Sequence, residues 1–330
     1  MTKDHELRCA GRVVARYVWD PQLPATVSPR PYLHPVTTLG GTTVTGFMPA
    51  DHVHHLGASI AVPIVNEANF WGGNTYVTGR GSVHLNNHGQ QTHHRWLHRS
   101  ADSLEHELHW TGQDGTLLAV ERRTLSVQQL TADAWILRVS YMLTSIDGLT
   151  INSPATRGRA GAGYGGFFWR APAGLDHIHA YGLDSNGDVH GSRDPWVVLS
   201  GAHPGEAPWT LIFLTPTAAV PAVPGALQPG PVPAFSVPPS SASDPFGLAS
   251  SGGPFYARRS SVADSDSTRG EGGADPWFVR AADYAGVCSA IAWDRPLVIA
   301  PGRTFTRRLS VVIADGPPRD ETIRAAQESA

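Results

Sequence analysis

WILRVSYML, residues 135–143, decides the fold, because its apolar and polar side chains alternate. A period of two indicates a β-strand that buries one face. The face that we expect to be buried carries Trp135, Leu137, Val139, Tyr141 and Leu143. Residues 117–127, 209–214 and 303–313 also read as strands. In the last of these the side chains on one side are Phe305, Leu309, Val311 and Ile313.

Turns recur between these strands. The chain has 35 glycines and 27 prolines, and Asp147-Gly148 and Asn186-Gly187 are typical turn dipeptides. Helical patterns between the strands are missing, which favours antiparallel sheets over β-α-β units. We therefore expect an all-β protein: one large antiparallel β-sandwich domain over residues 1–330, with a short C-terminal helix at about residues 320–328.

A segment rich in Pro, Ser and Gly, residues 216–273, interrupts the strand pattern. Nine prolines lie between Pro216 and Pro245. Proline lacks the N–H that a central strand needs. We expect a surface insertion of the sandwich, with a domain linker as the alternative.

The composition is that of an ordinary globular protein. Of its residues 41% are hydrophobic and 16% are charged, and the net charge is -3. Nothing in it resembles a basic nucleic-acid surface, an apolar span of about eighteen residues or a secretory signal. Two cysteines, Cys9 and Cys288, are too few for a disulfide framework. We expect a cytoplasmic protein without nucleic-acid or membrane partners.

Histidine is concentrated in one part of the chain. Ten of the 16 histidines lie within residues 52–109, and the densest block is DHVHHLG, which begins at Asp51. Imidazole exchanges protons near neutral pH and is the commonest metal ligand. An extended block would put His52 and His54 on one face, whereas a turn would bring His54 and His55 together. We expect Asp51 to orient a histidine, and acid–base chemistry is favoured over a divalent metal held by His52, His54 or His55.

The motif RPYLHP, which begins at Arg30, precedes this block. In a strand its Tyr32 and His34 point to the same side. Together with Arg30 they suit a polyhydroxylated or anionic ligand. The alternative is an ordinary polar strand end.

An aromatic residue followed by glycines, NFWGG, comes next. The glycines let the backbone approach a flat ligand closely, and Trp71 is either a stacking platform for a sugar or a core residue. Further candidate substrate contacts are Asn66, His93 and Tyr164.

Two other motifs are rejected as sites. HELH, residues 106–109, lacks the spacing of a zinc-protease helix, so it reads as a strand with solvent-facing polar residues. The glycine-rich run at residues 157–166 follows no β-α unit, so no nucleotide cofactor is expected. A tight loop that brings Tyr164 and Arg170 towards a cleft is favoured instead.

Several motifs occur in an order that resembles the bacterial "PmoA family". They are RPYLHPVTTLGGTTVT, DHVHHLG, NFWGG, GYGGFFWR, DPWFVR and APGRTFTRRLSVVIADG. The match covers about residues 28 to 315 without the Pro-rich segment. A methane-oxygenase role, which the family name suggests, would need transmembrane helices. The resemblance instead implies a galactose-mutarotase-like supersandwich and a sugar-catabolic context with a partner sugar dehydrogenase. The family usually has DHxHHRG, and Leu56 replaces its Arg, which implies a change of specificity if that Arg binds substrate.

The resemblance implies a lyase that performs β-elimination on a 3-keto-glycoside or a 3-keto-anhydrosugar, for example 3-keto-levoglucosan. Such a reaction needs a base, an oxyanion donor and an acid. We expect His54 or His55 as the base, with Arg30, Tyr32 and His34 around the oxyanion and leaving group. The alternatives are an aldose or keto-sugar epimerase and a non-catalytic sugar-binding module. A homodimer is compatible with an exposed sheet.

Overall fold

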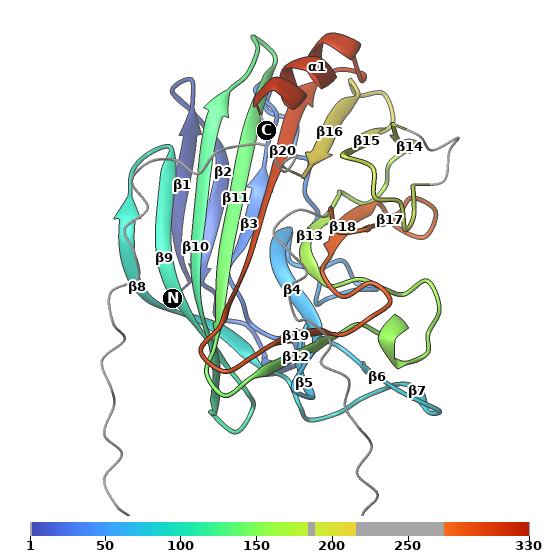
Figure 1. The fold of residues 1–330 in the computed structure, drawn as a ribbon. Coiled ribbons are helices and arrows are strands. Elements are labelled where there is room, and N and C mark those ends of the chain that lie inside the picture. The colour runs from blue at the N-terminus through green and yellow to red at the C-terminus, as the bar shows by residue number, and fades with distance from the viewer. Residues whose placement is uncertain (1, 184–188, 216–273, 330) are drawn as a thin grey trace, which may run out of the picture. The chain divides into compact units, whose positions relative to one another are not determined.

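The stretch WILRVSYML lies inside β11 (Ala134–Ser145), within an eight-stranded antiparallel sheet (Figure 1). Its neighbours are β10 (Leu117–Gln129) and β20 (Thr304–Asp315). Trp135 pairs with Ile313, and Val139 pairs with Leu309. The predicted apolar faces of both strands belong to one core, in which Phe305 is partly buried and the other predicted residues are buried, so this prediction is confirmed.

The structure is a computed structural model that describes residues 2–183, 189–215 and 274–329. The eight-stranded sheet has the order β14-β15-β16-β20-β11-β10-β9-β8. Its remaining strands are β8 (Gln90–Arg99), β9 (Ser103–Thr111), β14 (His177–Gly182), β15 (Trp196–Ala202) and β16 (Trp209–Leu214). The predicted insertion at residues 216–273 lies outside the described residues.

A ten-stranded sheet follows the path β1-β2-β3-β4-β13-β18-β17, and β5, β12 and β19 are attached to it. These strands are β1 (Lys3–Cys9), β2 (Arg12–Asp20), β3 (Tyr32–Val36), β4 (Ala58–Val65), β5 (Ala68–Phe70), β12 (Leu149–Asn152), β13 (Gly166–Arg170), β17 (Trp277–Arg280), β18 (Gly286–Ala290) and β19 (Leu297–Ile299). The smaller elements are β6 (Thr75–Val77), β7 (Gly81–Val83) and the 3-10 turns η1 (Ala25–Val27) and η2 (Ala155–Arg157).

The inner faces of the two large sheets form one hydrophobic core. It includes Ile60 and Phe167 from the ten-stranded sheet and Leu125 and Leu137 from the eight-stranded sheet. Every residue of β4 is buried, because both of its faces are covered. The all-β sandwich predicted from the sequence is therefore confirmed.

The C-terminal helix α1 (Asp320–Ser329) lies over the outer face of the eight-stranded sheet (Figure 1). Its Ala326 is buried in an apolar cluster with Ile136, Ile212 and Val312. Acidic Asp320 in the first turn suits the positive end of the helix dipole. The helix prediction is thus confirmed, and none of the helices in the described part of the chain could span a membrane.

The outer face of the ten-stranded sheet carries the candidate site. Side chains of β4, β13 and β18 form a small apolar cluster there, with Ala61, Phe168 and Cys288 at its centre. The chain segment before β4 is tied to the end of β13, because Gly46 N donates to the carbonyl of Arg170 at 2.8 Å. Arg170 N in turn donates to the carbonyl of Gly57 at 2.9 Å. These bonds hold DHVHHLG beside that cluster.

Candidate functional site

The block DHVHHLG forms turns, and these bring three imidazole rings together. His52 N donates to the carbonyl of Pro49, and His55 N donates to the carbonyl of His52, each at 2.9 Å. The ring centroids of His52 and His55 lie 4.6 Å apart in a stacked arrangement, and those of His54 and His55 lie 4.8 Å apart edge to face. We call His52, His54 and His55 the histidine cluster. The prediction that a turn brings His54 and His55 together is confirmed.

Gly57 closes this block for a steric reason. Its φ is +52°, and a Cβ there would lie 2.2 Å from the carbonyl oxygen of Leu33. Only glycine combines a left-handed conformation with so close an approach. The last residue of the motif therefore holds the turn against β3.

Asp51 orients His52. Its Oδ2 lies 2.7 Å from His52 Nδ1, and this hydrogen bond holds the pKa of the Asp51 carboxyl below its usual range. An ionised carboxylate can only accept, so Nδ1 carries the proton, and Nε2 of a neutral His52 is left as the acceptor. The prediction that Asp51 contacts a histidine is confirmed, and that histidine is His52.

His54 and His55 are held neutral. Burial, reinforced by the positive charge of Arg30, lowers the pKa of His54 to about 4. Burial also places the pKa of His55, which is 2% exposed, well below its usual range. The two residues that we expected to act as bases are therefore poor proton acceptors, whereas the side chain of His52 remains 34% exposed.

Two residues from distant parts of the chain complete the cluster. Tyr284 lies 5.2 Å from the ring of His52 and 5.2 Å from that of His55. The guanidinium of Arg170, at the end of β13, lies 4.4 Å over the ring of Tyr284, and its Nη1 is 3.5 Å from His55 Nδ1. The buried Nε of Arg170 has no hydrogen-bond partner among the described residues. Burial raises the pKa of Tyr284, so its hydroxyl stays protonated and can donate.

Sequence reasoning missed Tyr284 altogether and placed Arg170 only in a loop directed towards a cleft. The only sequence signal for these two residues was their place near motifs: Arg170 ends the motif GYGGFFWR, and Tyr284 follows DPWFVR by four residues. The position of these motifs in the sequence does not predict that both side chains contact the block DHVHHLG.

Trp71 packs beneath the cluster. It is 6% exposed, and its ring lies 4.8 Å from Phe168, 4.6 Å from Tyr164 and 5.7 Å from His55. Trp71 and Tyr164 are thus brought together with the histidines, as expected of site residues. The position of Trp71 matches the core alternative, and its role as a stacking platform stays a prediction.

The glycines of NFWGG accommodate a histidine. A Cβ at Gly73 would lie 2.8 Å from Nδ1 of His54, and one at Gly72 would lie 2.7 Å from the Cβ of His54. The flat group that the backbone approaches is therefore the imidazole of His54. The side chain of His54 fills the space in which we expected a ligand, so that expectation is wrong.

Arg30 is a structural cation under the loops. It is 1% exposed, and it donates to the carbonyls of Val27, Ser28 and Trp71 at 3.0 Å and of His54 at 2.8 Å. Burial, with the charge of Arg123, lowers its pKa to about 9. In this position Arg30 fixes the loops that carry His54 and Trp71, and its predicted contact with substrate would require these bonds to open.

Tyr32 and His34 lie on the same side of β3, as the strand period predicts. Their rings stack on Phe47 at 5.0 and 5.1 Å. Leu56 is fully buried in an apolar cluster with Tyr32 and Phe47. Leu56 therefore packs beside the aromatic pair, and a catalytic role for Tyr32 and His34 stays a prediction.

Two predicted contacts lie elsewhere. Asn66 sits in the turn after β4, where its side chain donates to the carbonyl of Gly148 at 2.8 Å and accepts from Thr150 N at 2.7 Å. His93 lines a cavity of about 490 Å³ beside Trp19. Within the described part of the chain, no hydrogen bond or ring contact joins either residue to the histidine cluster.

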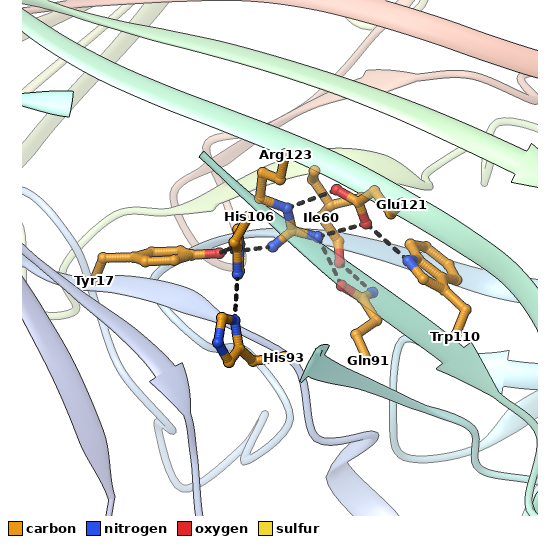
Figure 2. Close-up of polar contacts among 8 residues, drawn as sticks. All are labelled: Tyr17, Ile60, Gln91, His93, His106, Trp110, Glu121 and Arg123. Carbon is orange, nitrogen blue, oxygen red and sulfur yellow. Dashed lines mark hydrogen bonds and ion pairs between the residues drawn. The ribbon is translucent and has the colours of Figure 1, made fainter. Parts of the chain in front are cut away.

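His93 also ends a buried polar network between the sheets (Figure 2). Arg123 binds both carboxylate oxygens of Glu121, at 2.7 and 2.8 Å, and donates to the hydroxyl oxygen of Tyr17. Tyr17 OH lies 2.8 Å from Nε2 of His106, and Nδ1 of His106 lies 3.0 Å from Nδ1 of His93. The prediction that HELH is a strand is confirmed in β9, but His106 is fully buried and faces inward.

A metal at the histidine cluster was the second option from the sequence. In the described ranges, only His94, Glu107 and His109 bring three possible ligand atoms within 4.8 Å of one another. The histidine cluster does not form such a group among the described residues.

The chain matches the family described as "Family of unknown function (DUF6807)" over residues 4–251 and 252–328. It belongs to that family. No curated protein and no solved structure gives a significant match.

Proposed function

We propose that the histidine cluster belongs to the active site of a carbon–oxygen lyase that acts on an oxidised sugar. The substrate would be a 3-keto-glycoside or a 3-keto-anhydrosugar such as 3-keto-levoglucosan. The observation that carries the proposal is the Asp51–His52 hydrogen bond beside Arg170 and Tyr284. It supplies a partly exposed, oriented base next to two donors.

In the proposed reaction, the C3 ketone acidifies the proton on C2. Nε2 of His52 takes that proton, and a C1–C2 double bond forms as the C1–O bond breaks. The leaving oxygen receives one proton, so the reaction is an elimination without net oxidation or reduction. An imidazole held by a carboxylate suits the first step, because the carboxylate stabilises the imidazolium that forms.

Arg170 and Tyr284 would stabilise the negative charge. The guanidinium has a buried Nε without a partner among the described residues, and the Tyr284 hydroxyl is a protonated donor. Donors aimed at a developing enolate act strongly where water is excluded. We assign Arg170 to the enolate oxygen and Tyr284 to the leaving oxygen.

The substrate class rests on the resemblance described above, which implies a partner dehydrogenase that forms the 3-keto group. The same side chains would serve a keto-sugar epimerase, in which the C2 proton returns without elimination. A binding module would need neither the Asp51–His52 pair nor exchange of that proton.

A proton NMR time course in D2O separates these three functions. Purified protein is incubated with 3-keto-levoglucosan or with a methyl 3-keto-glucoside. A lyase removes the C2 proton and produces an enone signal at the same rate. Exchange of the C2 proton without an enone assigns an epimerase, and no change with either sugar contradicts catalysis on this substrate class.

The variants locate the reaction. His52→Gln should lower the rate about 10²- to 10⁴-fold, the usual worth of a general base, and Asp51→Asn should lower it less. His98→Gln, on exposed β8, is the matched control and should leave the rate unchanged. Full activity of His52→Gln would refute the assignment of the base.

A further inference from the structure

A β-bulge at the edge of the eight-stranded sheet re-aims one histidine. β8 and β9 pair His93 with Leu108 and then Arg95 with Glu107, so His94 is an extra residue on β8. A bulge inserts one residue and puts consecutive side chains on the same face. His94 and Arg95 are accordingly both exposed on the outer face, whereas His93 turns inward.

The bulge brings His94 to two side chains of the neighbouring strand. The rings of His94 and His109 are stacked with their centroids 4.2 Å apart. Nε2 of His94 lies 3.8 Å from Oε1 of Glu107. The possible ligand atoms of His94, Glu107 and His109 all lie within 4.8 Å of one another.

We propose that His94, Glu107 and His109 form a binding site for one divalent transition-metal ion such as Zn²⁺ or Ni²⁺. Two imidazoles and one carboxylate prefer such ions to Mg²⁺ or Ca²⁺, which favour oxygen ligands. Three protein ligands leave at least one coordination position for water or another ligand. The site lies on the opposite sheet from the histidine cluster and is independent of the proposed lyase activity.

The distances between the possible ligand atoms are close to those around a bound metal ion. Metal–ligand bonds of about 2.0–2.2 Å place two ligands of a tetrahedral ion roughly 3.4 Å apart. The 3.8 Å between His94 and Glu107 is close to this value, and all three side chains lie at the surface or are partly exposed. Small side-chain rotations can therefore close the site.

Arg95 is compatible with a bound ion. Its Nη2 donates to Oε2 of Glu107 at 2.9 Å, and its Nε donates to Oε1 at the longer distance of 3.3 Å. Oε1 is also the oxygen nearer His94. A metal ion on Oε1 would leave the stronger Arg95 bond in place as a support for the ligating carboxylate.

Calorimetric titration of the full chain with ZnCl₂ or NiCl₂ at near-neutral pH tests this site. We expect the wild type to bind one equivalent more than His109→Ala. We expect Glu107→Gln to bind that equivalent at least tenfold more weakly. His98→Ala, which removes an exposed histidine from the same strand, should bind like the wild type.

A second readout is the visible absorption of Co²⁺, which should decrease in His94→Ala while the circular dichroism of the strands is unchanged. The proposal is overturned if His94→Ala and His109→Ala both bind Zn²⁺ like the wild type. It is also overturned if the wild type binds no ion at micromolar to millimolar metal. Either result is independent of turnover of a 3-keto sugar, so it leaves the lyase proposal untouched.

Discussion

The buried His106 should make the fold sensitive to mild acid. Burial, together with the positive charges of Arg123 and His93, lowers its pKa to about 2. The unfolded chain takes up a proton on this histidine as the pH falls through its ordinary pKa of about 6.5, while the folded chain does not. Burying His106 in its neutral form therefore costs nothing in the free energy of unfolding above about pH 6.5. Below that pH the free energy of unfolding decreases steadily.

The size of the effect follows from that shift. Each pH unit between the two pKa values costs about 1.4 kcal/mol. Between about pH 7 and about pH 5, the free energy of unfolding should fall by about 2 kcal/mol through His106 alone. His106→Gln removes this contribution. Glutamine can also accept the hydrogen bond of Tyr17, because Arg123 donates to the Tyr17 oxygen and leaves the hydroxyl proton for the residue at position 106.

Urea unfolding followed by tryptophan fluorescence measures the difference. The wild type should lose about 2 kcal/mol more than His106→Gln between about pH 7 and about pH 5. His98→Gln changes an exposed histidine on β8 and should lose as much as the wild type. Equal losses in wild type and His106→Gln would refute the reasoning, because they would mean that His106 is protonated in the folded protein.

Two substitutions test the packing around the site and the core. Gly57→Ala should lower stability by at least about 2 kcal/mol, measured by thermal unfolding, because its Cβ would meet the carbonyl of Leu33. Gly115→Ala has the same left-handed conformation in open space, so an equal loss there would show that the close approach does not matter. Glu121→Gln should cost about 3–5 kcal/mol in urea unfolding, because it leaves a buried arginine unpaired. Glu105→Gln at a more exposed pair should cost at most about 1 kcal/mol, and similar losses for both variants would contradict the argument.

The strands could be predicted because their signal is local. From Trp135 to Leu143 in β11, and from Leu309 to Ile313 in β20, every second side chain is an apolar residue of the core, so the period of two is visible in the sequence. β9 has the same period, but its inner face includes His106. Polarity alone therefore predicted the wrong environment for that residue. The burial of His106 depends on Tyr17, which the opposite sheet supplies.

The candidate site likewise has some features that the sequence predicts and others that depend on the tertiary structure. The sequence by itself determined that strands dominate the fold and that DHVHHLG concentrates titratable groups, since alternation and composition need no distant partner. Only the tertiary structure decided which histidine is oriented and exposed, because Asp51 reaches His52 while burial makes His54 and His55 neutral. The tertiary structure also decided which hydrogen-bond donors lie beside the histidine cluster, because strand pairing brings Arg170 and Tyr284 to it. The register of that pairing depends on contacts between residues far apart in sequence.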